Sequence, residues 1–231
     1  MNADGTQQRQ LTANSGNNKE PAVSPDGRYI FFVSDRAGTF NIWRVDRDGN
    51  NPQRLTSGSG EESPQCTPDG KWVLYTVLGA GKPTIWRVPI TGGAPQQLID
   101  DYSSSPSVSP DGKSLACFYR SAQTNGQTEL AIFPTEGGQP TRTFAIVMMA
   151  ETTHYLPPLR WTMDGRGLTY VATTGGSSNF WIQPVSGEPA KQLTNFKADQ
   201  IFAFDWSRNG KQLIFSRGTV TSDVVLITTF R

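Results

Sequence analysis

Five segments of the chain alternate apolar and polar residues with a period of two, the pattern of a β-strand with one buried face. In each segment two apolar residues stand two positions apart, at Ile30 and Phe32, Val73 and Tyr75, Leu115 and Cys117, Leu168 and Tyr170, and Leu213 and Phe215. No segment sustains an apolar period of 3.6 residues, and 16 prolines and 23 glycines interrupt the chain. The sequence therefore predicts an all-β fold.

A short turn phrase precedes each of these strands. It reads Ser-Pro-Asp-Gly-Arg at residues 24–28 and recurs, with substitutions, at 67–71, 109–113, 162–166 and 207–211. The Asp-Gly or Asn-Gly pair supplies the positive φ that a tight hairpin turn requires, so each copy joins one strand to the next. Successive copies stand 43, 42, 53 and 45 residues apart. This is the period of a four-stranded propeller blade.

Two further strands are expected in each repeat. The third strand follows the turn by about fifteen residues, at 41–45, 84–88, 129–133, 179–183 and 223–227, and the fourth ends near Leu55, Leu98, Phe144 or Leu193. The chain is therefore predicted to be a single β-propeller domain over residues 1–231. Its blade cores cover about 18–56, 60–99, 103–144, 156–194, and 201–231 together with 1–12.

The two ends of the chain suggest how the ring of blades closes. The last repeat ends after its third strand, whereas residues 1–5 align with 45–49 and lie the same six residues before a leucine. We therefore expect the N-terminal segment to supply the outer strand of the last of five blades, which leaves no long edge unpaired. Residues 227–231 and 1–5 correspond to the same stretch of the repeat, however, so a longer parent propeller stays open as an alternative.

Tryptophans and cysteines are expected in the core rather than in a site. Trp43, Trp86 and Trp181 share one repeat position, and Trp161 and Trp206 share another. A large ring at a fixed position is what packing between blades requires. The two cysteines, Cys66 and Cys117, are too few for a disulfide framework or a zinc site, so we interpret both as small core residues.

These repeats resemble a known family. The Pro-Asp-Gly-Lys/Arg turn, the Ile-Trp-Arg-Val strand and the Arg-Leu-Thr or Gln-Leu-Thr ending are similar to the WD40-like repeats of the TolB type, over nearly the whole chain. The resemblance implies a propeller in a bacterial periplasmic or extracellular location. Residues 204–227 most resemble the C-terminal sensor propeller of bacterial transmembrane serine/threonine kinases. Such repeats also resemble the gating propeller of prolyl-oligopeptidase-type peptidases, which is the alternative.

Composition removes several functional classes. Lys plus Arg is 21 and Asp plus Glu is 20, so a net charge of +1 gives no field that would attract nucleic acid. The longest apolar run, 144–150, is far shorter than a bilayer requires. His154 is the only histidine, and no Gly-x-Ser-x-Gly phrase is present. We therefore expect a monomer that is not an enzyme, with no cofactor, no metal and no membrane insertion.

Carboxylates recur in the connections between blades. All five connections carry at least one, at Glu20, Glu61, Glu62, Asp100, Asp101, Glu151 and Asp199, and Tyr102, His154 and Tyr155 lie among them. In a propeller these connections share one face and approach the central channel. This face is therefore the candidate surface for a protein, a peptide or a cationic small molecule. Calcium is a subsidiary candidate. The acids are also consistent with polar loops on an inert scaffold.

Overall fold

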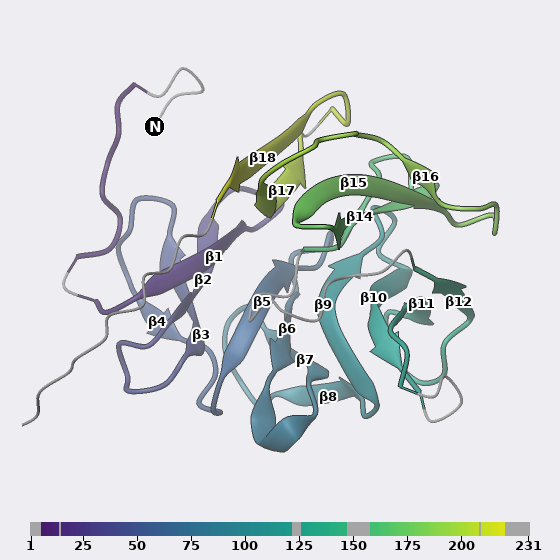
Figure 1. The fold of residues 1–231 in the computed structure, drawn as a ribbon. Coiled ribbons are helices and arrows are strands. Elements are labelled where there is room, and N and C mark those ends of the chain that lie inside the picture. The colour runs from purple at the N-terminus through teal and green to yellow at the C-terminus, as the bar shows by residue number, and fades with distance from the viewer. Residues whose placement is uncertain (1–5, 14, 122–125, 147–157, 208, 220–231) are drawn as a thin grey trace, which may run out of the picture.

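The five predicted repeats form sheets placed around a common centre (Figure 1). The computed structural model describes residues 6–13, 15–121, 126–146, 158–207 and 209–219. Within these residues the fold is all-β, with four antiparallel four-stranded sheets and one two-stranded sheet. In the four complete sheets the strands follow one another in chain order from the centre outward. The predicted propeller is thus confirmed.

Each complete blade takes its four strands from one repeat. The first blade contains β1 (Asn18–Val23), β2 (Tyr29–Ser34), β3 (Asn41–Asp46) and β4 (Gln53–Arg54). The second contains β5 (Glu61–Cys66), β6 (Trp72–Val77), β7 (Thr84–Pro89) and β8 (Gln96–Ile99), with a 3-10 turn η1 (Gly79–Gly81) between β6 and β7. The third contains β9 (Tyr102–Val108), β10 (Ser114–Arg120), β11 (Glu129–Pro134) and β12 (Arg142–Ala145). The fourth contains β13 (Arg160–Trp161), β14 (Gly167–Thr174), β15 (Ser177–Pro184) and β16 (Lys191–Gln192). The fifth sheet contains β17 (Gln200–Trp206) and β18 (Leu213–Gly218).

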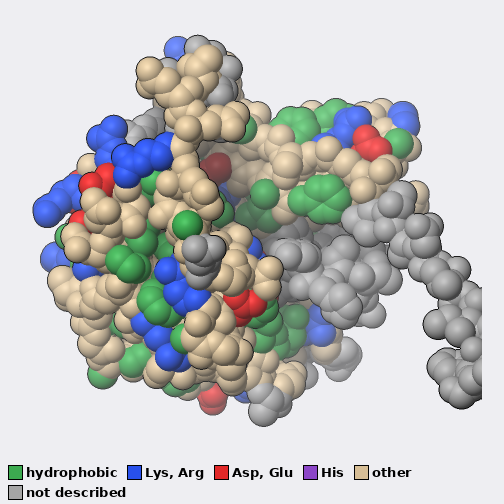
Figure 2. Space-filling model, turned by 90° about the vertical axis from the view of Figure 1, so that its left-hand side faces the viewer, with side chains coloured by type: hydrophobic (Ala, Val, Ile, Leu, Met, Phe, Trp, Pro, Cys, Tyr) green, Lys and Arg blue, Asp and Glu red, His purple; other side chains and the backbone are tan. Residues whose placement is uncertain are grey.

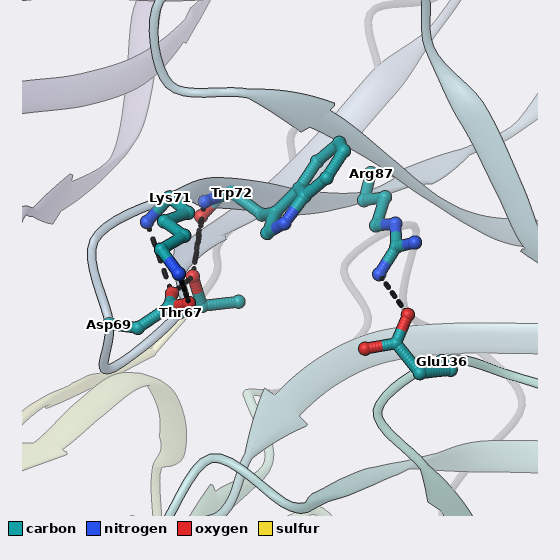
Figure 3. A network of polar contacts seen from close by, with 6 residues as sticks. All are labelled: Thr67, Asp69, Lys71, Trp72, Arg87 and Glu136. Atoms are coloured by element: carbon teal, nitrogen blue, oxygen red, sulfur yellow. Dashed lines mark hydrogen bonds and ion pairs between the residues drawn. The ribbon is translucent and has the colours of Figure 1, made fainter.

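The repeated turn phrase folds through its own side chains. In the second blade the Thr67 hydroxyl donates to Asp69 Oδ1 at 2.6 Å, and Lys71 N donates to the same oxygen at 3.1 Å (Figure 3). The backbone N–H of Trp72 then donates to Thr67 Oγ1 at 3.1 Å. The other four copies form the same bonds with Ser or Thr and Asp or Asn. Local hydrogen bonds therefore fix every inner hairpin.

The core lies between neighbouring blades. The predicted apolar pairs of the second, third and fourth repeats are buried, Tyr75 at 1% exposure and Tyr170 at 0%. The alternate residues of the same strands are buried as well, including Leu74, Ala116 and Phe118. The expectation of a single buried face was therefore wrong for these strands, because each blade is covered on both sides by a neighbour. In the fifth sheet Phe215 is 41% exposed among the described residues.

Three of the five tryptophans predicted in the core lie between blades. Trp86 and Trp181 are half-buried and pack against two inter-blade clusters, and Trp161 is buried. The Trp161 indole donates to the Ser107 carbonyl oxygen of the third blade at 2.9 Å. Cys117 is buried as expected, whereas Cys66 is half-buried. Burial raises the pKa of the Cys66 thiol to about 12, so it stays protonated and unreactive at neutral pH.

The blade count differs from the expectation in the part of the chain that is described. The fifth sheet has two strands there, and the third strand expected at 223–227 lies outside the described residues. Residues 6–12 belong to no sheet. Leu11 nevertheless lies against Gly49 as Leu98 of β8 lies against Gly137 of the third blade. The N-terminal segment thus occupies the place of an outer strand before the first blade, and its pairing with the last blade stays a prediction.

The charged surface is mixed. Seen from the side of the first blade, Lys and Arg side chains gather in groups, with Asp and Glu side chains in a few places among them (Figure 2). None of the described residues forms a helix whose length and hydropathy would suffice to span a bilayer.

Candidate binding site

A cavity of about 850 Å³ lies where the inner strands of the five sheets meet. One residue from each repeat lines it at the same repeat position, six residues before the Asp or Asn of the turn, namely Glu20, Ser63, Ser105, Pro158 and Ala203. The cavity is therefore the central channel of the propeller, and its size lies within the range of ligand pockets.

A repeated irregularity of the backbone sets this lining. Glu20, Ser63 and Ser105 have φ values of 54°, 55° and 54°, in a region that non-glycine residues adopt at a cost on the order of 1–3 kcal/mol each. The pairing register of β1, β5 and β9 shifts at these residues. Each is followed by a proline, which has no N–H to donate and fits where pairing is interrupted. In β1, β5 and β9 a β-bulge therefore presents the side chain at this position to the channel.

Glu20 is the carboxylate of this set. Its side chain is 26% exposed, and its Oε2 accepts a hydrogen bond from Ser63 N at 2.5 Å. Burial raises the pKa of Glu20 above its usual value, and the neighbouring Glu62 raises it further; the bond from Ser63 N and the charges of Lys19 and Arg160 lower it only in part. The charged form is thus under-compensated in the protein alone.

Ser105 places a hydroxyl without a partner at the same level. It is 3% exposed, and its Oγ makes no hydrogen bond among the described residues. A buried polar atom without a partner costs about 1–3 kcal/mol. The channel wall therefore offers an unsatisfied hydroxyl in addition to an under-compensated carboxylate.

The other charges of the channel are paired with each other. Lys19 Nζ lies 2.5 Å from Glu62 Oε1 and 3.9 Å from Glu20 Oε1. Arg160 Nε lies 3.4 Å from Asp205 Oδ1. The wall formed by β17 and β18 is apolar in part, because Phe202, Ile214 and Phe215 line it. The channel thus contains one under-compensated carboxylate, two ion pairs and an apolar wall.

Comparison with known proteins places the architecture. Residues 1–142 match the family of the TolB β-propeller domain. The chain belongs to this family. It is similar in structure to TolB from Acinetobacter baumannii, at 23% identity and a TM-score of 0.70 over 84% of this chain and 47% of that one. It is also similar to puromycin hydrolase, at 16% identity and a TM-score of 0.60 over 90% of this chain and 34% of that one. A protein of Agrobacterium fabrum, Atu1656, is 45% identical over 56 residues, which are 24% of this chain and 19% of that protein.

These likenesses have defined limits. The chain spans about half the length of the Acinetobacter TolB and less of the other two proteins. At identities below 25% the two solved structures show the fold and do not transfer an activity. The closer resemblance to the sensor propellers of transmembrane kinases stays a prediction.

Those predicted acids that the structure describes do not form a free acidic surface in this TolB-type propeller. Glu62 is paired with Lys19, Asp199 lies 3.0 Å from Arg217, and Asp101 accepts a hydrogen bond from the Tyr119 hydroxyl at 2.9 Å. Asp100 is exposed, with Lys82 at 3.9 Å. Tyr102 is half-buried beneath the Arg120 guanidinium, at 4.4 Å from the ring centroid. Glu151, His154 and Tyr155 lie outside the described residues.

Glu61 is the clearest correction. It was expected at the binding face, but it is 2% exposed. Its carboxylate accepts hydrogen bonds from Asn41 Nδ2 at 3.0 Å, from Gly58 N at 3.1 Å and from the Thr56 hydroxyl. It therefore holds the connection between the first and second blades in place and is not available to a partner.

Sequence reasoning singled out Glu20 but missed the set to which it belongs. Ser63, Ser105, Pro158 and Ala203 share its repeat position, and none of them is charged. The recurring Xaa-Pro at 20–21, 63–64 and 105–106 is the signal that marks the position. Among the described residues, no group of three or more His, Cys, Asp and Glu side chains could hold a metal ion.

Proposed function

We propose that this TolB-type propeller is a non-catalytic binding module whose central channel receives a cationic group carried by a peptide or protein, next to Glu20. The observation that carries the proposal is the state of this carboxylate, which burial and Glu62 leave under-compensated within a cavity of about 850 Å³. A ligand cation would add to the opposite charge of Lys19 and Arg160, which offsets the effect of burial only in part. Lys19 and Arg160 are already directed to Glu62 and Asp205.

The rest of the channel suits a peptide. The Ser105 hydroxyl provides a hydrogen-bonding group, and Phe202, Ile214 and Phe215 provide apolar contact area opposite it. Ligand sites commonly combine an apolar wall with a small number of placed polar groups. Because several strands contribute one side chain each, the ligand is held by the ring of blades and not by a single loop.

Blocked tripeptides with a central Lys, Arg or Glu test this proposal by titration calorimetry on the whole chain. We expect the Lys and Arg peptides to bind and Glu20→Gln to weaken them at least tenfold, whereas Asp100→Asn, at an exposed acid outside the channel, leaves affinity unchanged. Equal binding of the Glu peptide, or unchanged affinity in Glu20→Gln, would contradict the proposal.

The remaining expectations rest on family membership. A TolB-type propeller is consistent with a periplasmic or extracellular, monomeric protein, and we propose that location and state for this chain. The role of a sensor module belongs to the same proposal. The alternative, a gating propeller whose hydrolase domain lies outside this chain, is supported only by the fold it shares with puromycin hydrolase.

A further inference from the structure

Away from the channel, an aromatic ring stacked on an arginine fills the groove between the first and second blades. The Arg44 guanidinium lies 4.4 Å from the ring centroid of Tyr29. It donates to Gln53 Oε1 at 2.6 Å and to the Ile90 carbonyl oxygen of the second blade at 2.6 Å. The arginine thus joins the two blades while its face covers the ring.

The next groove repeats this arrangement. The Arg87 guanidinium lies 4.3 Å from the ring centroid of Trp72 and 2.9 Å from Glu136 of the third blade (Figure 3). Gln96 accepts a further bond from Arg87 Nε at 3.0 Å. Two successive repeats therefore use an aromatic residue at the start of the second strand, covered by an arginine from the third strand.

The third blade keeps the connection to the next blade but lacks the ring. Ser114 stands at the position of Tyr29 and Trp72, and Ile132 stands at that of Arg44 and Arg87. Arg142 of the outer strand β12 takes over the inter-blade bond. It donates to the Val185 carbonyl oxygen, the counterpart of the Ile90 oxygen.

This substitution leaves a cavity of about 630 Å³ between the third and fourth blades. Its walls include Ser114, Ile132, Arg142, Trp161, Met163 and Val185. Met163 is 48% exposed although it is large and apolar. In the fourth blade the same position is Gly167, and there Ile182 lies so close that a Cβ on Gly167 would be 2.9 Å from it. Both blades lack the aromatic ring at this position. In the fourth blade Ile182 fills the space next to Gly167, whereas in the third blade the space next to Ser114 stays open.

We infer that the cavity between the third and fourth blades binds an aromatic side chain of a partner polypeptide, tryptophan or tyrosine. Such a ring would lie against the Arg142 guanidinium, as Tyr29 and Trp72 lie against their arginines. Met163 adds a thioether contact of the kind that aromatic rings favour. Both are among the residues that line the cavity.

Two carboxylates favour a ring that carries a hydrogen-bond donor. Asp111 and Asp164 line the same cavity, and each uses its Oδ1 in its own turn. The pKa of each is held below its usual value, first by the hydrogen bond from Ser109 or Thr162, so both stay ionised at neutral pH. An indole N–H or a phenol O–H complements a carboxylate, whereas a phenylalanine ring or an aliphatic side chain does not.

The test titrates the whole chain with N-acetyl-tryptophan amide, N-acetyl-leucine amide or indole. Binding is read from the nuclear magnetic resonance signal of the Trp161 indole N–H. We expect the tryptophan amide to shift this resonance to saturation and the leucine amide to bind at least tenfold more weakly. Three results would overturn the inference: binding of indole without binding of the tryptophan amide, an unshifted Trp161 signal, and equal binding of the leucine amide.

Two substitutions locate the site. Ser114→Trp gives the third blade the ring that Trp72 provides in the second. Because this ring would fill the cavity, binding should fall at least tenfold while the melting temperature stays the same or rises. Ser57→Trp, at an exposed loop position of the first blade, is the matched control and should bind normally. Met163→Ala removes an exposed contact without a change in the core and should weaken binding severalfold. Undiminished binding in Met163→Ala, or in folded Ser114→Trp, contradicts the inference. Glu20→Gln should have no effect, which separates this site from the channel.

Discussion

Asn41 Nδ2 donates a hydrogen bond to Glu61 Oε2 at 3.0 Å, which joins the third strand of the first blade to the first strand of the second. The Thr56 hydroxyl and Gly58 N donate to the same carboxylate. Three donors thus surround the carboxylate of Glu61, a residue that is 2% exposed. A buried carboxylate is tolerated only with such partners.

Glu61→Gln should therefore destabilise the fold. The substitution places an amide donor opposite groups that also donate, and a lost hydrogen bond to a charged group is worth about 1.5–3 kcal/mol. Urea unfolding followed by far-ultraviolet circular dichroism would measure the change. Glu136→Gln removes an acid whose side chain is 79% exposed and paired with Arg87, so it should cost less than about 1 kcal/mol. Equal losses in the two variants would contradict the structural role of Glu61.

The turn aspartates should make the fold sensitive to acid. The pKa values of Asp26, Asp69, Asp111 and Asp164 are lowered, first by the hydrogen bond from the Ser or Thr two residues earlier. Because the folded pKa is below the unfolded one, the stabilisation is present above the unfolded pKa of about 3.9 and is lost as pH falls through the folded value.

Thermal melts between pH 2 and pH 7 would test this dependence, with Asp111→Asn as the variant. Asn accepts the same two bonds without titrating, and Asn209 already does so in the fifth repeat. The variant should lose less stability than the parent chain on acidification. A pH profile parallel to that of the parent would show that the turn carboxylates do not contribute.

Glu20 should show the opposite dependence. Its pKa is raised, chiefly by burial, so its contribution to stability is present below the unfolded pKa and is lost as pH rises through the folded value. Glu20→Gln should therefore melt at a higher temperature than the parent at pH 7 and at a similar temperature near pH 3.5. A variant that is less stable than the parent at pH 7 would assign Glu20 to the framework and not to ligand binding.

Gly49→Ala tests whether the N-terminal segment packs against the first blade. Gly49 has a φ of +86°, and an added Cβ would lie 2.7 Å from the Leu11 carbonyl oxygen. Gly27→Ala is the matched control, since Gly27 has a φ of +71° with open space around it. A left-handed backbone costs each alanine about 1–2 kcal/mol. Gly49→Ala should lose more than this in urea unfolding and should expose residues 6–12 to protease. Equal losses would mean that Leu11 does not stabilise the first blade.

The fold could be predicted because its signals are local. Each Ser/Thr-Xaa-Asp-Gly turn satisfies its own hydrogen bonds within five residues, as between Ser24 and Tyr29. A recurrence of such turns at the blade period therefore reports the architecture directly. The strand positions follow from the same spacing.

The site was harder to predict from the sequence than the fold, because the exposure and the ion pairing of each side chain depend on neighbouring blades. Glu61 and Glu62 are adjacent in sequence, yet one is enclosed by three donors and the other pairs with Lys19, 43 residues away. The open groove was equally hidden. It arises from a difference between repeats, with Ser114 where Tyr29 and Trp72 stand, and only the packing of blades shows that the space stays empty.

The bulges at Glu20, Ser63 and Ser105 separate the framework from its selectivity. The backbone at these points keeps the same conformation with a carboxylate or a hydroxyl attached, and the corresponding places in the last two repeats carry proline and alanine. A mutation there changes the chemistry of the channel while the hydrogen bonds within the turns stay intact. The first three repeats can thus diversify their ligand preference one blade at a time, and an engineer can vary these three positions in combination without redesigning the scaffold.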